Sequence, residues 1–256
     1  MKPKTLILRT AGTNCDGETQ AAFEMAGSTV EKLHLNKVLA NPSLLNDYQL
    51  LAFPGGFSYG DDIAAGRILA NQIMHHLREP LRMFVDAGKP VLGVCNGFQV
   101  LVKTDLLPGP IAGAQGQTAT LTHNDSGRFQ CRWVKVKPVS RKCIWTQNLE
   151  EIELPIAHGE GKFVPASEAV RQGLIDSDQI ALAYVGENPN GSAGAIAGVC
   201  DASGLVLGLM PHPERYVSAL QHPAWTSQCP LPKAGAGLAL FQNAVRYAEQ
   251  AVGSGV

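Results

Sequence analysis

The sequence lacks any excess of charge of one sign and any long run of basic residues. Lys and Arg number 21 against 22 Asp and Glu, which gives a formal net charge of -1 at pH 7. Proteins that bind nucleic acid or anionic membranes through electrostatics carry a basic patch or stripe. We therefore expect neither nucleic acid nor a membrane among the partners of this chain.

Long hydrophobic runs and paired cysteines are also missing. No segment approaches the ~18 apolar residues of a membrane span, and the apolar run 5–8 is too short for the core of a signal peptide. None of the six cysteines forms a Cys-x-x-Cys pair, which argues against a zinc ribbon or a thioredoxin-like site. We expect a cytoplasmic protein with free thiols and no bound metal. Five of the cysteines are interpreted as small buried or surface residues: Cys15, Cys131, Cys143, Cys200 and Cys229.

The chain shows no internal repeat, low-complexity tract or clear linker, so residues 1–256 are interpreted as a single domain. In the first half, strand patterns alternate with helix patterns, which is typical of a parallel sheet covered on both faces. The expected strands are residues 6–9, 29–33, 50–53 and 90–94. The expected helices are 17–26 with Asp16 as N-cap, 63–87 with a possible break at Pro80, and 96–103.

The second half is richer in strands. Residues 129–133 alternate at period two, strand patterns follow at 180–185, 193–199 and 205–209, and a helix is expected over 238–251. The predicted fold class is therefore α/β: an open, mostly parallel sheet with helices on both faces and a strand-rich second half. Functional sites in such sheets lie at the carboxyl ends of the strands.

A cysteine lies at the tip of a Gly-x-Cys-x-Gly turn at such a strand end. The buried strand 90–94 runs directly into Cys95, and a helix begins at Asn96. Gly93 and Gly97 remove the side chains that would crowd a sharp strand-to-helix bend, as in a nucleophile elbow. The positive end of a helix dipole also favours the reactive thiolate. Cys95 is therefore the candidate nucleophile.

Among the seven histidines, His212 has the most informative setting. It follows an apolar strand pattern, lies between Pro211 and Pro213, and precedes Glu214 by two residues. The prolines stiffen the turn, and a carboxylate is the usual partner that orients a catalytic imidazole. His-x-Glu alone is more typical of a solvated turn, but beside a cysteine elbow the catalytic interpretation is favoured.

Residues 56–60, Gly-Phe-Ser-Tyr-Gly, match the serine-hydrolase pattern Gly-x-Ser-x-Gly. The preceding strand ends near Phe53, however, so Ser58 is expected in a loop beyond it. Gly55 and Gly56 suggest another use, because consecutive glycines allow backbone N–H groups to face a neighbouring site. Together with the N–H of Asn96 they are candidates for an oxyanion hole, with an ordinary glycine-rich turn as an equal alternative.

These motifs carry a resemblance to a known family. Pro-Gly-Gly at 54–56, Gly-x-Cys-x-Gly-x-Gln at 93–99 and Pro-His-Pro-Glu at 211–214 resemble the class I (triad-type) glutamine amidotransferases in order and spacing, over most of the chain. Within that family, residues 13–16, 55–61, 155–161 and 188–192 are similar to the glutaminase subunits of phosphoribosylformylglycinamidine synthase. The resemblance implies a flavodoxin-like fold.

The resemblance also implies a mechanism. Cys95 attacks the side-chain carboxamide of glutamine and forms a glutamyl thioester, with His212 as acid and base and Glu214 as its orienting partner. The residues expected to contact glutamine are Phe57, Gln99, His158 and Gly159. An exposed helical position is the alternative for Gln99, and a structural hydrogen bond is the alternative for His158.

Free ammonia is diluted and protonated in water, so such a glutaminase needs an ammonia-consuming partner. The resemblance implies a large ATP-dependent synthetase subunit that converts formylglycinamide ribonucleotide to formylglycinamidine ribonucleotide in purine biosynthesis, and a small accessory subunit. The chain has no Gly-x-x-x-x-Gly-Lys-Ser/Thr loop, so ATP and Mg²⁺ are expected on the partner. Residues 14–16 and 188–192 are candidate docking or channel loops, or simple turns.

Two other functions stay open: a cysteine or serine hydrolase of the same fold that acts on esters or peptides, and a non-catalytic regulatory subunit. One segment departs from the compact connection that the family suggests. Residues 221–232 contain three prolines and Trp225, which predicts an ordered or extended loop with Trp225 as a packing anchor or a contact surface.

Overall fold

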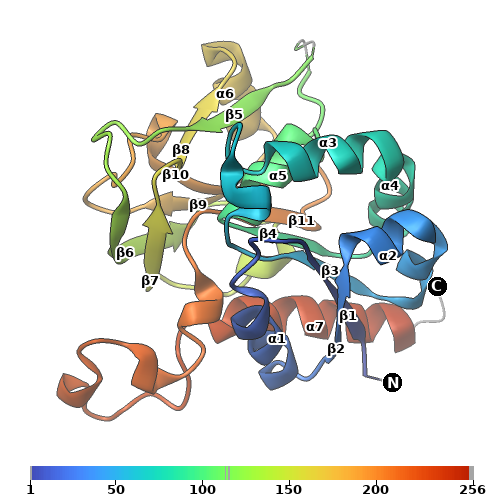
Figure 1. Ribbon diagram of the computed structural model, residues 1–256. Helices are drawn as coiled ribbons and strands as arrows, with labels where there is room; N and C mark the ends of the chain where they lie inside the picture. Colours follow the sequence, from blue (N-terminus) through green and yellow to red (C-terminus); the bar gives the residue numbers. More distant parts are fainter. Residues whose placement is uncertain (1, 113, 115, 254–256) are drawn as a thin grey trace.

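The computed structural model describes residues 2–112, 114 and 116–253. One nine-stranded sheet has the order β2-β1-β3-β4-β11-β10-β9-β6-β7, and β5 pairs with β8 in a separate small sheet (Figure 1). The strands are β1 (Lys4–Arg9), β2 (Thr29–His34), β3 (Leu50–Phe53), β4 (Val91–Val94), β5 (Ala119–Thr122), β6 (Gln130–Pro138), β7 (Ile152–His158), β8 (Lys162–Pro165), β9 (Ile180–Tyr184), β10 (Ile196–Cys200) and β11 (Val206–Leu209).

The α-helices are α1 (Asp16–Met25), α2 (Leu35–Ala40), α3 (Arg67–His76), α4 (Arg78–Asp86), α5 (Asn96–Lys103), α6 (Glu168–Asp176) and α7 (Leu238–Gly253). Short 3-10 turns are η1 (Pro42–Asp47), η2 (Ser58–Asp61), η3 (Ile144–Thr146), η4 (Ala193–Ala195), η5 (Pro213–Arg215), η6 (Ala219–Gln221) and η7 (Trp225–Ser227). Within the described residues, none of the helices is long and apolar enough to cross a membrane.

The large sheet is parallel in its first part and antiparallel in its second. Strands β2, β1, β3, β4 and β11 run parallel. The sheet then continues with β10, β9, β6 and β7 in antiparallel pairs. Every residue of β3, β4 and β11 is buried, as expected for strands with helices on both faces. The predicted α/β sheet with a strand-rich second half is confirmed.

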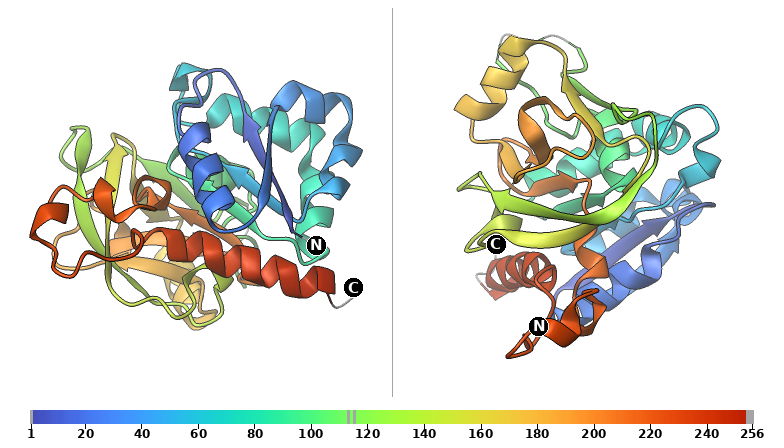
Figure 2. Two further views of the ribbon diagram at one scale, coloured as in Figure 1. Left: turned by 90° about the horizontal axis from the view of Figure 1, so that it is seen from below. Right: turned by 90° about the vertical axis from the view of Figure 1, so that its left-hand side faces the viewer.

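Helices cover both faces of the parallel part. Helices α1 and α7 contact each other on one face, and α3 and α5 contact each other on the other (Figures 1 and 2). Phe23 of α1 packs edge-to-face against Phe241 of α7, with ring centroids 5.0 Å apart. On the other face, Phe98 of α5 stacks on Phe163 of β8. Burial of each such ring contributes about 2–3 kcal/mol, so these contacts stabilise the packing of α1 and α5 against the sheet.

Two helix boundaries differ from the expectation. The N-cap of α1 is Cys15, without a side-chain cap, and Asp16 is the first helical residue. The helix expected over 63–87 is two helices that separate at Leu77. A proline ring excludes the carbonyl group four residues earlier but is tolerated in a first turn. Pro80 therefore prevents a continuous helix through His76 and instead lies in the first turn of α4.

The strand expected over 193–199 also begins later than predicted. Residues Ala193–Ala195 form the 3-10 turn η4, in which Gly194 has φ 60° and Ala195 has φ 55°. Extended strands need negative φ, so β10 begins only at Ile196.

Residues 219–233 project from the fold near the start of α7 (Figures 1 and 2). Trp225 keeps 42% of its surface exposed and therefore does not anchor this segment in the core. The segment is held at its base by His222, whose ring lies 4.7 Å from that of Trp133 and whose Nε2 lies 3.0 Å from the carboxylate of Glu153.

Candidate active site

Cys95 lies where β4 turns sharply into α5. Its backbone has φ 50° and ψ −106°, a conformation that costs a non-glycine residue about 1–3 kcal/mol. Hydrogen bonds from Cys95 N to Leu209 O (2.8 Å) and from Gln99 N to Cys95 O (3.1 Å) hold it in place. This strained strand-to-helix turn has the geometry expected of a nucleophile elbow.

The two glycines of the turn allow close packing of the elements around it. A Cβ atom on Gly97 would overlap the carbonyl oxygen of Phe53, the last residue of β3. A Cβ atom on Gly93 would lie 2.5 Å from Leu101 Cδ1. Helix α5 therefore packs directly on β3 and β4, and a side chain at either glycine would push the elbow away from its neighbours.

His212 and Glu214 form a buried pair just beyond β11. Nδ1 of His212 lies 2.6 Å from Oε1 of Glu214, and the His212 backbone N–H donates to Pro155 O at 2.8 Å. The carboxylate accepts a hydrogen bond from the Nδ1–H group, so that Nε2 is left to exchange protons with other groups. Nε2 has no hydrogen-bond partner within the described part of the chain.

The electrostatic surroundings favour the charged form of His212. Burial by itself disfavours an imidazolium, but the nearby Glu214 carboxylate, with smaller contributions from Cys95 and Cys15, outweighs it and raises the pKa of His212 well above its usual value. At neutral pH His212 therefore holds a proton that it can donate to a leaving group.

The sheet brings the candidate nucleophile and the candidate base together. Strands β4 and β11 are adjacent and parallel, with Val94 paired to Leu209. Their carboxyl ends therefore share one edge, where Cys95 follows Val94 directly and His212 follows Leu209 after two residues. Both side chains line one cavity of about 150 Å³.

A second cavity of about 180 Å³ adjoins the first and is also lined by Cys95. Five other residues predicted from the sequence line it: Gly56, Phe57, Gln99, His158 and Gly159. The remaining lining residues are Asp61, Ala65, Phe129, Ala157 and Glu160. Gly55 and Asn96 lie beside the cavities rather than in this lining. A Cβ atom on Gly55 would lie 2.9 Å from Cε1 of His212, so only glycine admits the imidazole there.

Gln99 is buried, so its interpretation as an exposed helical residue is wrong. Its Nε2 donates to Glu160 O at 2.6 Å, and its Oε1 accepts from Asn96 Nδ2 at 3.0 Å. Asn96 in turn donates to Asp61 Oδ1 (3.1 Å) and accepts from Ser58 N (3.1 Å). This chain of hydrogen bonds joins the start of α5 to both walls of the cavity.

Ser58 lies in η2, beyond the end of β3, as expected from the sequence. It is buried, and among the described residues its Oγ has no hydrogen-bond partner that could act as a base. Asp61, in the same turn, was not predicted as a site residue. Burial raises the pKa of Asp61, although Gly66 N and Asn96 Nδ2 both donate to it.

His158 makes a structural hydrogen bond in addition to lining the cavity. Its Nδ1 lies 3.2 Å from Asn124 Oδ1. Burial, with a further contribution from the charge of His212, lowers the pKa of His158 to about 4. The ring is therefore neutral at pH 7 and does not add a second positive charge to the site.

Comparison with known proteins shows the family to which this chain belongs. A family model described as a CobB/CobQ-like glutamine amidotransferase domain matches residues 2–248. The phosphoribosylformylglycinamidine synthase subunit PurQ of Dehalococcoides mccartyi is 49% identical over 256 residues, which cover 97% of this chain and 99% of the relative. The chain belongs to the PurQ family of glutamine amidotransferases.

Other relatives agree with this assignment. PurQ of Treponema denticola is 44% identical over 241 residues, covering 85% of this chain and 89% of the relative. A chain in the structure of PurLQS from Thermotoga maritima superposes with a TM-score of 0.75 at 32% identity, covering 96% of this chain and 99% of that chain. The family resemblance inferred from the motifs is confirmed.

Cys15 is a further residue of this PurQ-family site that was not assigned to it from the sequence. Cys15 is buried, as expected, but it lines the same cavity as Cys95 and His212. Arg215 Nη2 lies 3.1 Å from Cys15 Sγ. Burial raises the pKa of the Cys15 thiol even though His212 and Arg215 oppose this. The available signals were its place in the segment 13–16, which resembles the family, and its position after β1, whose carboxyl end lies at the same sheet edge as that of β4.

Cys15, His212 and Glu214 also form the one group of metal-ligand types found within 4.8 Å of one another in the described residues of this PurQ-family chain. His212 and Glu214 are already bonded to each other, and the Arg215 cation lies against Cys15. This arrangement disfavours a further cation, and the expectation that the chain holds no metal stays a prediction.

Proposed function

We propose that this chain is the glutaminase subunit of a phosphoribosylformylglycinamidine synthase. It hydrolyses glutamine to glutamate and ammonia, and an ATP-dependent synthetase subunit uses the ammonia to convert formylglycinamide ribonucleotide to formylglycinamidine ribonucleotide. The observation that carries this conclusion is the buried His212–Glu214 pair beside a cavity lined by Cys95, in a chain similar to PurQ along almost its whole length.

The first half-reaction forms a thioester. Cys95 Sγ, with its proton already transferred to His212, attacks the carboxamide carbon of glutamine. The oxyanion receives hydrogen bonds from backbone N–H groups of the Gly55–Gly56 segment and of Asn96. The Phe57 N–H is not available to the oxyanion, because it already donates to Gly12 O at 2.9 Å. The Asn96 N–H is available, because it is the first N–H of α5 and such groups have no partner within the helix. Gly55 also leaves room for the His212 ring. His212 donates its proton to the nitrogen as the C–N bond breaks, and ammonia leaves.

The second half-reaction releases glutamate. His212 Nε2, now neutral, takes a proton from water as the water oxygen attacks the thioester carbonyl carbon. The C–S bond breaks, glutamate is formed, and the proton returns to the Cys95 sulfur. Glu214 holds the imidazole in one orientation throughout and stabilises its charged form. Phe57, Gln99, His158 and Gly159 bind glutamine in the adjoining cavity.

We also infer the setting in which this chemistry occurs. The partners are a large synthetase subunit, which binds ATP and Mg²⁺, and a small accessory subunit; the description of the Thermotoga maritima structure as PurLQS supports a multi-subunit assembly. The whole chain acts as one glutamine amidotransferase domain, because a single sheet includes strands from both halves. Its location is the cytoplasm.

The experiment measures glutamate release and formation of formylglycinamidine ribonucleotide with the cognate synthetase. Cys95→Ala is expected to abolish both with glutamine, while ammonium chloride still supports nucleotide formation. Cys131→Ala, which removes an exposed thiol outside both cavities, is the matched control and is expected to behave as wild type. A Cys95→Ala protein that still releases glutamate would overturn the assignment. Ester or peptide hydrolysis lost on Ser58→Ala but kept in Cys95→Ala would favour a serine hydrolase.

A further inference from the structure

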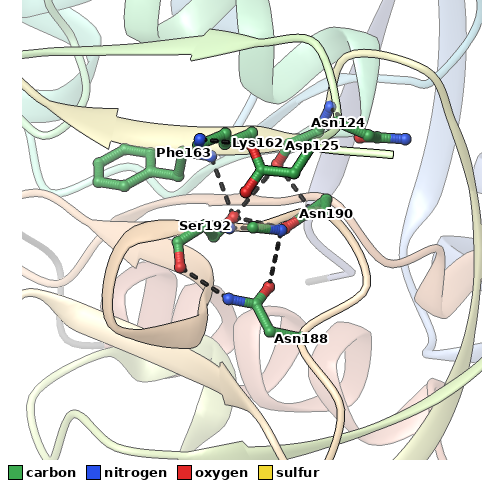
Figure 3. Close-up of polar contacts among 9 residues, drawn as sticks. Asn124, Asp125, Lys162, Phe163, Asn188, Asn190 and Ser192 are labelled. Carbon is green, nitrogen blue, oxygen red and sulfur yellow. Dashed lines mark hydrogen bonds and ion pairs between the residues drawn. The ribbon is translucent and has the colours of Figure 1, made fainter. Parts of the chain in front are cut away.

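The motif Asn-Pro-Asn-Gly-Ser at 188–192 lies beside β8, and Figure 3 shows its Asn190 and Ser192 close to Phe163 of that strand. Asn190 and Ser192 are almost completely buried. Asn190 Nδ2 donates to Gly161 O at 2.8 Å, and Ser192 Oγ lies 3.4 Å from the same carbonyl oxygen. The motif therefore binds the main chain just after His158–Glu160, the turn that lines the cavity.

The Asn190 side chain is itself held in a single orientation. Its Oδ1 accepts from Ser192 N at 3.1 Å and from Ser192 Oγ at 2.7 Å. The amide nitrogen must therefore face Gly161 O and the Tyr184 hydroxyl, which is 3.2 Å away. Phe163 N donates to Ser192 Oγ at 3.0 Å, which ties β8 to the same motif.

Asn124 holds the turn from its other side. Its Nδ2 donates to His158 O at 2.9 Å, and its Oδ1 accepts from Gly161 N at 3.0 Å. The two asparagines are linked, because Asp125 N donates to Asn190 O at 3.2 Å. The residues between His158 and Gly161 are thus fixed at both ends by buried side-chain amides.

These hydrogen bonds lead to residues that line the proposed glutamine cavity. Gly159 and Glu160 line the cavity, and Glu160 O accepts the hydrogen bond from Gln99 Nε2. A shift of Gly161 moves Glu160 O directly, and with it the orientation of the Gln99 amide. Cys95 and His212, in contrast, follow the ends of β4 and β11, and in the described part of the chain neither forms a hydrogen bond with Asn190.

We propose that Asn190 is a positioning residue for glutamine binding, which acts through the Gly161 carbonyl and the Glu160–Gln99 contact, and not on the nucleophile. The assignment rests on the proposed glutaminase function. It explains the composition of the motif: Gly191 has φ 80°, and a Cβ atom there would overlap the Asp125 carboxylate, so only glycine allows the loop to approach Asn124 and Asp125.

The test is Asn190→Asp, which keeps the size of the side chain and the acceptor for Ser192 but replaces the donor facing Gly161 O by a second oxygen. Leaving a buried carbonyl without its donor weakens glutamine binding, so KM for glutamine is expected to rise about tenfold or more while kcat changes less than about threefold. Cys95 is also treated with 6-diazo-5-oxo-norleucine, a glutamine-like electrophile. The rate of its modification is expected to fall by the same factor by which KM for glutamine rises. Modification of Cys95 by iodoacetamide, which lacks the amino-acid group, is expected to stay unchanged.

The matched control is Glu187→Gln, just before the motif. Glu187 is exposed and forms an ion pair with Arg132, outside both cavities, so KM of this variant is expected to stay within about twofold of wild type. Ser192→Ala removes the hydroxyl that donates to Asn190 Oδ1 and therefore disturbs the Asn190 side chain less directly. This variant tests the proposal if Asn190→Asp does not fold. It is expected to raise KM in the same direction.

Three results would overturn the assignment: a wild-type KM in both the Asn190 and Ser192 variants, an equal rise of KM in Glu187→Gln, or a parallel loss of kcat and of iodoacetamide reactivity. Failure of the proposed function looks different, because wild-type protein would then neither release glutamate with its synthetase nor react with the glutamine-like electrophile.

Discussion

Replacement of Glu214 by glutamine isolates the effect of one buried charge on the catalytic base. Glu214 is fully buried, and its Oε1 lies 2.6 Å from His212 Nδ1. Glutamine keeps the shape of the side chain and removes the charge. Two unit charges ~4 Å apart interact by about 4 kcal/mol at an effective dielectric constant of ~20, and about 1.4 kcal/mol corresponds to a tenfold change in rate. We therefore expect kcat for glutamine hydrolysis to fall by roughly a thousandfold.

The same substitution changes the pH dependence. The Glu214 carboxylate opposes the effect of burial and raises the pKa of His212, so the wild-type imidazolium persists into the alkaline range. Without the carboxylate, burial lowers the pKa of His212, and the ring loses its proton at a lower pH. The alkaline limb of kcat, measured by glutamate release from about pH 5 to pH 10, is expected to move to lower pH in Glu214→Gln.

A matched control exists in a second histidine–glutamate pair. His222 Nε2 lies 3.0 Å from Glu153 Oε2, but this pair lies outside the cavities and Glu153 is 41% exposed. Glu153→Gln is expected to keep kcat within about twofold, as is usual for exposed ion pairs. A Glu214→Gln enzyme that retained more than a tenth of wild-type kcat with an unshifted alkaline limb would refute this account of His212.

Two further predictions concern stability. Because the pKa of His158 is lowered from 6.5 to about 4, the unfolded chain binds a proton between these values that the folded chain does not. The free energy of unfolding is therefore expected to fall by about 2 kcal/mol more from pH 7 to pH 4.5 in wild type than in His158→Asn, as measured by guanidinium unfolding; equal acid sensitivity would contradict this. Gly97→Ala, whose Cβ overlaps the Phe53 carbonyl, is expected to cost about 3 kcal/mol, whereas Gly17→Ala, whose Cβ meets no atom within 4 Å, is expected to add about 0.5 kcal/mol. Similar stabilities of these two variants would contradict the packing described for the elbow.

The residues proposed to react could be predicted from the sequence because each lies in a short local pattern. Gly93, Cys95 and Gly97 define the turn within five consecutive positions, and His212 and Glu214 are two positions apart. Their environments depend on strands that precede them directly, so no long-range contact had to be known. The parallel direction of β1, β3 and β4 could be predicted from the alternation of strand and helix patterns in the sequence.

What the sequence did not reveal depends on contacts between distant segments. Cys15 reaches the site only because β1 and β3 pair, and the role of Asn190 depends on a turn about thirty positions earlier in the chain. Strand β7 was not predicted because Pro155 lies in its middle. The proline is tolerated because β7 is the edge strand of the sheet, where one side of the strand needs no backbone N–H donor for pairing. The carbonyl group of Pro155 accepts a hydrogen bond from the His212 N–H.

The pairing of β4 with β11 also determines when a newly made chain becomes active. Cys95 and His212 are 117 positions apart, and β11 lies between β4 and β10 in the sheet. During synthesis the nucleophile emerges long before its base, and the two meet only after β11 has inserted beside β4. A chain truncated between residues 95 and 206 carries the thiol but lacks the proposed base, and we expect it not to hydrolyse glutamine, so such unfinished copies would consume none of the cell's supply.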